Sequence, residues 1–310
     1  MMIRRRKLFM DTIVDIQVVT GLGTVAENTD EKGNRLASEQ DMQNQINRAF
    51  HAFRQVEQAC SRFSLDSELM RATRQIGEPV QVSPSLFEPL KLALHMAELT
   101  SGIFDPTVGK RLEQHGFNQH YLTHQYINSP AVESATYRDI VLDEVHQTIT
   151  LLKPLVIDLG AVAKGFAIDL AAHELQSFAG FMVNAGGDLY AGGRDEQDKP
   201  WEIGIQHPTH ADEVICTLEL SDAAICTSGG YERKSIVAAD IHHLLHPVTG
   251  QSPKEWVSSS IIAPYAMMAD IFSTAVMLLG KEEGKKLMEQ ANVQGILITP
   301  DLQLVREGVY

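Results

Sequence analysis

The sequence predicts an α+β fold in which mixed sheets pack against helices. Segments with helical periodicity and segments rich in β-branched residues both occur along the chain. They do not alternate at the regular spacing of βαβ units, which disfavours a doubly wound parallel sheet. No stretch repeats at a fixed period, which disfavours a solenoid or a propeller. We therefore expect a single domain over residues 1–310, with a subdomain division near the polar stretch 125–135.

The N-terminal part predicts one strand followed by two helices. Residues 12–20 alternate loosely between apolar and polar side chains, as a half-buried strand does. Residues 21–41 are largely polar and predict a loop. Apolar side chains recur at helical spacing in 42–60 and again in 84–100. Ser83 stands where an N-cap precedes a proline at the first helical position, so it marks the start of the second helix.

The remaining elements are mostly short strands. A loop is expected at 102–109 and helices at 164–178 and 267–279. The expected strands lie within 137–155, 181–183, 201–206, 213–220, 258–263, 295–299 and 303–309.

Composition excludes several classes of protein. The formal net charge of −14 argues against a nucleic-acid surface and does not favour an anionic membrane. No run of about 18 apolar residues predicts a membrane span. Cys60, Cys216 and Cys226 are scattered and odd in number, which suits reduced thiols. The basic cluster in residues 1–10 has no apolar region behind it, so we expect no signal peptide and a cytoplasmic protein.

Residues 269–274 predict a site for a hard metal ion. If the apolar run that follows is a helix, Asp270, Ser273 and Thr274 lie at i, i+3 and i+4 and share one face. A carboxylate flanked by hydroxyls suits Mg²⁺ and does not suit a soft metal. The alternative is an ordinary helix start, where Asp, Ser and Thr are common.

Residues 156–165 predict an anion site close to that metal. A buried strand ends there in a turn of small residues, with Asp158 before the turn and Lys164 after it. Gly160 and Gly165 would let backbone N–H groups approach an anion without interference from a Cβ atom. The alternative is a plain strand-to-helix turn with a solvated lysine.

Three further motifs allow two interpretations each. The glycine-rich stretches 184–188 and 227–231 could line a substrate channel or could simply turn the chain. His242, His243 and His246 could bind zinc, but Pro247 and Gly250 indicate a turn, and no further Cys or His stands nearby. His243 could instead act as a base or contact a phosphate.

Taken in order, these motifs resemble those of the FAD:protein FMN transferases, the ApbE family. Each motif alone is weak, but they follow the family order over nearly the whole chain. The matching stretches are 9–12, 61–68, 102–109, 158–169, 183–188, 227–231, 243–250 and 269–274. The resemblance implies a compact flavin-transferase architecture related to the T-fold.

The resemblance also implies roles for individual residues. It places FAD against Met10, Phe63, Ile103, Phe104, Asp105, Asp158, Lys164 and Leu244. It places Mg²⁺ on the carbonyl of Ala161 and on the side chains of Asp270, Ser273 and Thr274. His243 or Asp270 would then serve as the base. The chain departs from the family pattern at Phe63, which is often tyrosine, at Ser273, which is a carboxylate in some relatives, and at His246, which is commonly aspartate.

The implied reaction is Mg²⁺-dependent transfer of FMN from FAD to a threonine or serine hydroxyl of a target flavoprotein, with release of AMP. The sequence leaves three alternatives open. An FAD pyrophosphatase would use the same residues with water as the acceptor. The others are a flavin-binding protein without catalysis and an unrelated histidine metallohydrolase.

Overall fold

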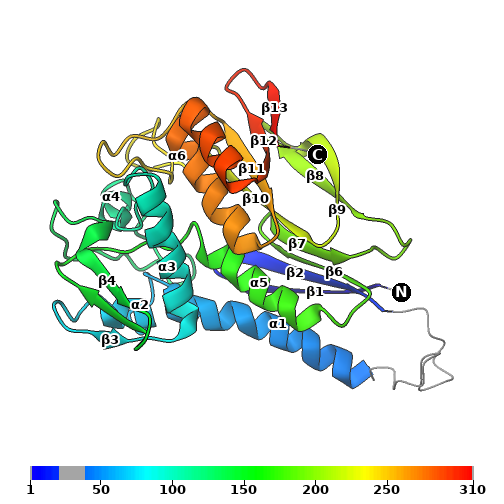
Figure 1. Cartoon of the computed structure of the whole chain (residues 1–310), viewed down its shortest axis with the longest axis horizontal. Helices are drawn as coiled ribbons and strands as arrows, with labels where there is room; N and C mark the ends of the chain where they lie inside the picture. Colours follow the sequence, from blue (N-terminus) through cyan, green and yellow to red (C-terminus); the bar gives the residue numbers. More distant parts are fainter. Residues whose placement is uncertain (1, 21–38, 309–310) are drawn as a thin grey trace.

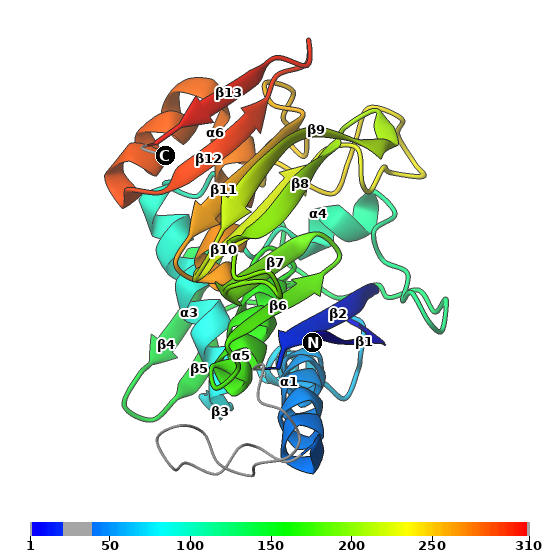
Figure 2. The same cartoon turned by 90° about the vertical axis from the view of Figure 1, so that its right-hand side faces the viewer.

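An antiparallel sheet of eight strands runs through the centre of the fold (Figures 1 and 2). The computed structural model describes residues 2–20 and 39–308. In spatial order the strands are β1 (Met2–Phe9), β2 (Thr12–Val19), β6 (Gly180–Ala185), β7 (Asp188–Gly193), β10 (Ala223–Gly229), β11 (Ser258–Ala263), β12 (Gln294–Ile298) and β13 (Leu304–Glu307).

Helices cover one face of this sheet and a separate hairpin covers part of the other. The helices are α1 (Glu39–Cys60), α2 (Glu68–Ala72), α3 (Pro84–Leu99), α4 (Gly109–Gln114), α5 (Ala163–Leu175) and α6 (Ala266–Ala291), with a 3₁₀ turn at Tyr137–Asp139. The hairpin consists of β8 (Trp201–His207) and β9 (His210–Leu220). A third, small sheet has the order β3 (Val80–Gln81), β5 (Thr148–Leu151), β4 (Ile140–Asp143).

Strand β10 shows how the sheet is buried on both faces. Successive side chains of a strand point to opposite faces. Ala224 and Cys226 accordingly join the core under the helices, while Ile225 joins the core under the β8–β9 hairpin. The small residues on the helix side let α6 lie close to the sheet, where it packs against β7, β10 and β11.

The predicted α+β class is confirmed, and so are most of the predicted elements. Strands form at β2, β4, β5, β6, β8, β9, β11, β12 and β13, and helices form at α1, α3, α5 and α6. Ser83 is the N-cap of α3 with proline in its first turn, although its hydroxyl makes no capping bond. The division near 125–135 stays a prediction.

Several predicted boundaries and turns are wrong. Residues 39–41 begin α1 instead of ending a loop, and the rest of the predicted loop, 21–38, lies outside the described residues. Residues 227–229 belong to β10, since they pair with β11, so this glycine-rich stretch is not simply a loop. Helix α6 runs past 279 to Ala291, with a non-helical Gly280 (φ 76°) at the predicted end.

Strands β1, β3, β7 and β10 and the short helices α2 and α4 were not predicted. The side chains of β1 are mostly exposed and largely basic, so the strand lacks an apolar pattern. Within the described part of the chain, no helix is both long and apolar enough to cross a membrane.

Candidate functional site

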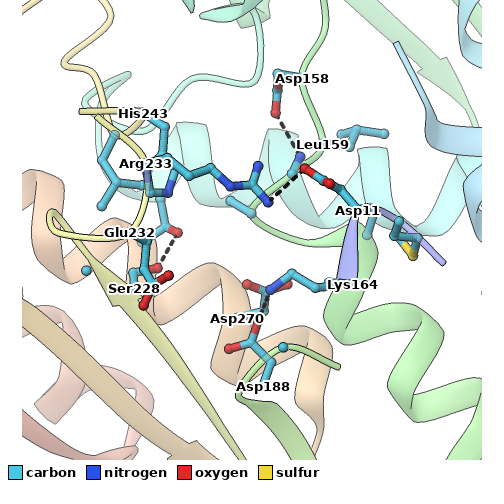
Figure 3. A pocket seen from close by; sticks show the side chains of 18 of the residues that line it. Asp11, Asp158, Leu159, Lys164, Asp188, Ser228, Glu232, Arg233, His243 and Asp270 are labelled. Atoms are coloured by element: carbon cyan, nitrogen blue, oxygen red, sulfur yellow. Dashed lines mark hydrogen bonds and ion pairs between the residues drawn. The ribbon is translucent and has the colours of Figure 1, made fainter. Parts of the chain in front are cut away.

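A cavity of about 780 Å³ opens beside the first turns of α5 and α6 (Figure 3). Its volume lies in the range of about 300–1,000 Å³ that is typical of small-molecule sites. The ends of β6, β7 and β10, the tip of the β1–β2 hairpin and the loops around residues 116–121 and 229–245 complete its wall. The cavity therefore gathers residues from almost every predicted motif.

Helices α5 and α6 are held together by a carboxylate. Asp169 of α5 accepts hydrogen bonds from the backbone N–H groups of Ala266 (2.7 Å) and Met267 (2.8 Å). These are the first residues of α6, whose own N-cap, Tyr265, supplies no side-chain cap. Because the first N–H groups of a helix lack partners within the helix, Asp169 both caps α6 and fixes its start against α5.

Gly165 allows the two helices to meet closely. A Cβ atom at this position would lie 2.4 Å from the carbonyl oxygen of Ala266 and 2.6 Å from the Cα atom of Met267. The Gly165 N–H donates to Asp270 Oδ2 at 3.0 Å. The glycine thus sets the distance between the helices and also orients the carboxylate of Asp270.

We expect Gly165→Ala to lower the free energy of unfolding by about 1–3 kcal/mol, as overpacking of a core does. The added methyl group would push α6 away from α5 and displace Asp270, so turnover should fall as well. Chemical denaturation of purified protein measures the first effect. Gly284→Ala is the control. A Cβ atom added there would lie 3.0 Å from its nearest neighbour, the Val276 carbonyl oxygen, compared with 2.4 Å for a Cβ atom added at Gly165. Equal losses in the two variants would contradict the role given to Gly165.

One end of the cavity holds a cluster of two carboxylates and one ammonium group (Figure 3). Lys164 forms an ion pair with Asp188, and Asp188 Oδ1 also accepts the Thr227 N–H at 2.9 Å. Burial would lower the pKa of Lys164, but Asp188 and Asp270 outweigh it, so the pKa is raised and the side chain stays charged. Burial raises the pKa of Asp270 to about 7, against the opposing effect of Lys164.

A set of hydroxyl groups lies beside Asp270. Ser228 Oγ is 2.8 Å from Ser273 Oγ and 2.9 Å from Thr274 Oγ1, and Ser273 Oγ donates to the Asp270 carbonyl at 2.8 Å. Thr274 lines the cavity, whereas Ser273 is fully buried and does not line it. The geometry therefore favours Thr274 over Ser273 as a metal ligand, and the predicted role of Ser273 stays a prediction.

The donor set fits a hard cation. Asp270 is only 4% exposed and faces the cavity, and Thr274 and Ala161 line the same region. The Gly165 N–H is one of the first four of α5, which have no acceptor within the helix, and it donates to Asp270. Carboxylate, hydroxyl and carbonyl oxygens are the ligands that Mg²⁺ accepts, and the rest of its six positions commonly go to water and substrate phosphates.

Arg62 and Asp158 form a buried ion pair in the cavity wall. Arg62 Nε donates to Asp158 Oδ2 at 2.5 Å, and Arg62 Nη2 donates to the Phe117 carbonyl at 2.5 Å. Asp158 Oδ1 accepts the Gly160 N–H at 2.8 Å. Burial would raise the pKa of Asp158, but Arg62 outweighs burial and the pKa is lowered.

We expect Arg62→Ala to lower the free energy of unfolding by about 1–3 kcal/mol, because it leaves Asp158, whose side chain is 20% exposed, without its charged partner. The folded-state pKa of Asp158 is below its unfolded value of about 3.9. The stabilisation is therefore present above that pH and is lost as the pH falls through the folded-state pKa. Urea unfolding at a series of pH values measures this loss in the free energy of unfolding.

The control for this prediction is Arg48→Ala. Arg48 pairs with Glu174 at 2.6 Å on the surface, with 54% of its own side chain exposed. Exposed pairs of this kind contribute about 0–1 kcal/mol. If the two variants lost equal free energy of unfolding, the Arg62–Asp158 pair would stabilise the fold no more than an exposed ion pair does.

His243 faces the cavity from the loop after β10 (Figure 3). Its backbone N–H donates to the Arg233 carbonyl at 3.1 Å, and its Nδ1 is buried without a hydrogen-bond partner. Burial, together with Arg233 and His242, lowers the pKa of His243 to about 3. The imidazole is therefore neutral throughout the physiological pH range.

The three histidines of the HHxxH motif do not form a metal site. His242 Nε2 contacts the Pro253 carbonyl at 3.3 Å, and His246 Nδ1 accepts the Val248 N–H at 3.2 Å. In the described ranges, no group of three or more His, Cys, Asp or Glu side chains could hold a metal ion. The histidine metallohydrolase interpretation therefore has no supporting geometry.

The other predicted FAD contacts divide into two groups. Met10, Phe63, Phe104, Asp105 and Leu244 line the cavity together with Asp158 and Lys164. Ile103 does not line it. Asp105 is already engaged, since it accepts from the Thr107 N–H (2.8 Å), the Thr107 hydroxyl (2.7 Å) and the Tyr137 N–H (3.1 Å). Ile103 as an FAD contact stays a prediction that the geometry does not favour.

The structure adds residues that sequence reasoning missed. Asp188 ends the glycine-rich stretch 184–188, for which the sequence allowed a channel lining or a turn, and it is the partner of Lys164. Phe63 meets His120 edge to face, with ring centroids 6.3 Å apart, and His120 stacks on Tyr121 at 5.1 Å. His120 and Tyr121 line the cavity and offer flat surfaces for a ring system. No sequence motif signals them.

Comparisons with known proteins find one family along most of the chain. The sequence model of the ApbE family matches residues 10–297. A relative from Haemophilus influenzae named FAD:protein FMN transferase is 30% identical over 259 residues, covering 77% of this chain and 73% of its own. A relative of the same name from Vibrio cholerae is 30% identical over 280 residues, covering 85% and 80%.

Solved structures share the fold. The crystal structure of the ApbE protein from Thermotoga maritima superposes with a TM-score of 0.82 at 27% identity, covering 99% of this chain and 97% of its own. The flavin transferase ApbE from Vibrio cholerae gives a TM-score of 0.79 at 24% identity, covering 99% and 97%. The second likeness supports the fold alone.

Proposed function

The chain belongs to the ApbE family, and we propose that it transfers FMN from FAD to a threonine or serine hydroxyl of a target flavoprotein and releases AMP. The curated relatives carry the name FAD:protein FMN transferase, which supports an enzyme that moves flavin between FAD and protein. The Mg²⁺ requirement, the hydroxyl acceptor and the release of AMP are the parts of the proposal that go beyond those names.

One observation carries the proposal. Asp270, Thr274 and Ala161 line the same cavity as Lys164, so their oxygen atoms could hold a hard cation near a fixed positive charge. Transfer from a diphosphate needs both a bound cation and a fixed positive charge, since the negative charge of the diphosphate must be neutralised while one phosphorus atom is attacked. Within about 780 Å³ the remaining wall offers room and aromatic surface for the rings of a dinucleotide.

The transfer step exchanges one phosphorus–oxygen bond for another. The acceptor oxygen bonds to the phosphorus nearer riboflavin, and the bond from this phosphorus to the oxygen shared with AMP breaks. AMP leaves with the electron pair of that bond, and the hydroxyl proton passes to a base. A bound Mg²⁺ would supply charge neutralisation at the diphosphate. Lys164, kept charged by Asp188, would stabilise the charge that grows on the departing AMP.

His243 is the base that the geometry favours. Asp270 is buried, accepts the Gly165 N–H and belongs to the proposed metal ligands, so its lone pairs are committed. His243 is neutral and lines the cavity beside Arg233 (Figure 3). With its pKa lowered to about 3, it is a weak base by itself. The negative charge of the FAD diphosphate beside it would raise its pKa and strengthen it.

A comparison of AMP release with and without an acceptor tests the proposal. Purified enzyme is incubated with FAD and Mg²⁺, alone or with the flavin-free form of a flavoprotein that normally carries FMN on threonine or serine. We expect slow AMP release from FAD alone and faster release with the acceptor. Fast release that is indifferent to the acceptor would instead identify an FAD pyrophosphatase. The cytoplasmic location stays a prediction from the sequence, and cell fractionation is its test.

A further inference from the structure

The tip of the β1–β2 hairpin is a strained turn in the cavity wall. The two strands pair as far as Phe9 and Thr12, so Met10 and Asp11 alone form the turn. Both have positive φ angles, 50° for Met10 and 62° for Asp11. A two-residue turn of this kind usually carries Asn or Asp followed by Gly. A methionine is disfavoured in this backbone region by roughly tenfold in population, so other parts of the fold must hold the turn in place.

Glu57 of α1 holds this turn. Its Oε1 atom accepts the Met10 N–H at 2.9 Å and the Tyr121 hydroxyl at 3.1 Å. The Asp11 N–H lies close to the Tyr121 oxygen as well. Burial, together with the charge of Glu57, raises the pKa of Tyr121, so the hydroxyl keeps its proton and donates it to the carboxylate. One carboxylate oxygen thus connects the hairpin tip to the loop that carries Tyr121.

Both groups that Glu57 connects belong to the cavity wall. Met10, Asp11, His120 and Tyr121 line the cavity, and the Asp11 side chain points into it (Figure 3). The rings of His120 and Tyr121 are stacked, with only 8° between their planes. Such a stack offers a flat surface to a further ring, and the thioether of a methionine also packs well against aromatic rings. The turn and the stack together therefore suit a planar ring of a ligand.

We propose that Glu57 is a positioning residue for FAD, which holds the Met10–Asp11 turn beside the His120–Tyr121 stack so that a ring of FAD meets a preformed surface. The inference rests on the proposed function, because FAD supplies the ring. Glu57 acts through Met10 and Tyr121 and not on the reacting phosphorus. Without its carboxylate the turn can relax to a commoner backbone conformation, and FAD must then order the turn as it binds, which weakens binding.

Steady-state kinetics of the acceptor reaction tests this inference. Loss of binding that is equal in the ground state and the transition state raises KM and leaves kcat unchanged. We expect Glu57→Ala to raise the KM for FAD about tenfold, because two hydrogen bonds to a charged group are lost. Glu57→Gln keeps an oxygen that can accept both bonds, so its KM should stay near that of the wild type. Asp222→Ala is the matched control, since this carboxylate holds the Gly193 N–H at 2.8 Å outside the cavity, and its KM should not change.

A double variant separates positioning from a purely structural role. Glycine is the preferred second residue of this turn, so Asp11→Gly relieves part of the strain that Glu57 opposes. In that background we expect Glu57→Ala to raise the KM for FAD only about threefold. An equal rise in both backgrounds, or a loss of thermal stability with an unchanged KM, would show that the inference is wrong, while flavin transfer by the wild type would still stand. If the wild type transferred no flavin to the acceptor, the proposed function would fail first, and the inference with it.

Discussion

Asp270→Ala is expected to abolish Mg²⁺-dependent turnover of FAD, with a loss of at least about 10³-fold. Asp270 is the one carboxylate in the proposed ligand set, so its removal withdraws several kcal/mol of charge stabilisation at the diphosphate. Each 1.4 kcal/mol corresponds to about tenfold in rate. The measurement is AMP release as a function of Mg²⁺ concentration, together with the acceptor reaction.

Two variants make this prediction specific. Asp270→Asn keeps an oxygen that can accept the Gly165 N–H but removes the negative charge, so it should fold as the wild type does and still lose turnover. Asp222→Ala removes a carboxylate outside the cavity, where it accepts the Gly193 N–H, and should keep its Mg²⁺ dependence. Near-normal turnover of Asp270→Asn with Mg²⁺ would show that the metal assignment is wrong.

His243→Ala is expected to slow transfer to the acceptor by about 10²–10⁴-fold, the usual contribution of a positioned base. The loss should appear in the acceptor reaction, because the base removes the proton of the incoming hydroxyl. His246→Ala is the control, since His246 lies in the same loop but does not line the cavity. Equal losses in the two variants would indicate damage to the loop and not the loss of a base.

The pH dependence of the free enzyme gives an independent check on His243. The form that accepts a proton is the neutral imidazole, which predominates above its pKa. Because burial, Arg233 and His242 lower this pKa to about 3, the neutral form persists well below the ordinary value of about 6.5. We therefore expect kcat/KM, which reports the free enzyme, to show no decline near pH 6.5 that depends on His243. Such a decline, absent in His243→Ala, would contradict the environment described for this residue.

Local patterns predicted the elements well where one face is buried and the pattern is regular. The helical spacing of α1 and α3 and the alternation of β8 are examples. Strand β1 could not be predicted, because its side chains are mostly exposed and its place in the sheet depends on pairing with β2. Strand β10 could not be predicted either, because its residues are mostly small or polar and show no strand pattern. In the fold these residues fit under α6 and next to Asp188.

The candidate site was predictable where a motif contained its own chemistry. Asp270 and Thr274 share a helix face, so sequence spacing alone grouped them, and Lys164 stood out as the lysine directly after the strand-to-helix turn. Interaction partners that come from distant segments of the chain could not be predicted from sequence spacing. The contacts between Lys164 and Asp188 and between Arg62 and Asp158 span 24 and 96 residues, and only the folded chain brings them together.

The most direct test of the proposed FMN transfer is the intact mass of the acceptor after reaction. A flavin-free acceptor is incubated with the enzyme, FAD and Mg²⁺, unfolded to release bound flavin, and then weighed by mass spectrometry. Flavin transfer should increase the acceptor mass by one FMN less one water, located on a threonine or serine and accompanied by one AMP per acceptor. An unchanged acceptor mass, with FAD converted to free FMN and AMP, would contradict it.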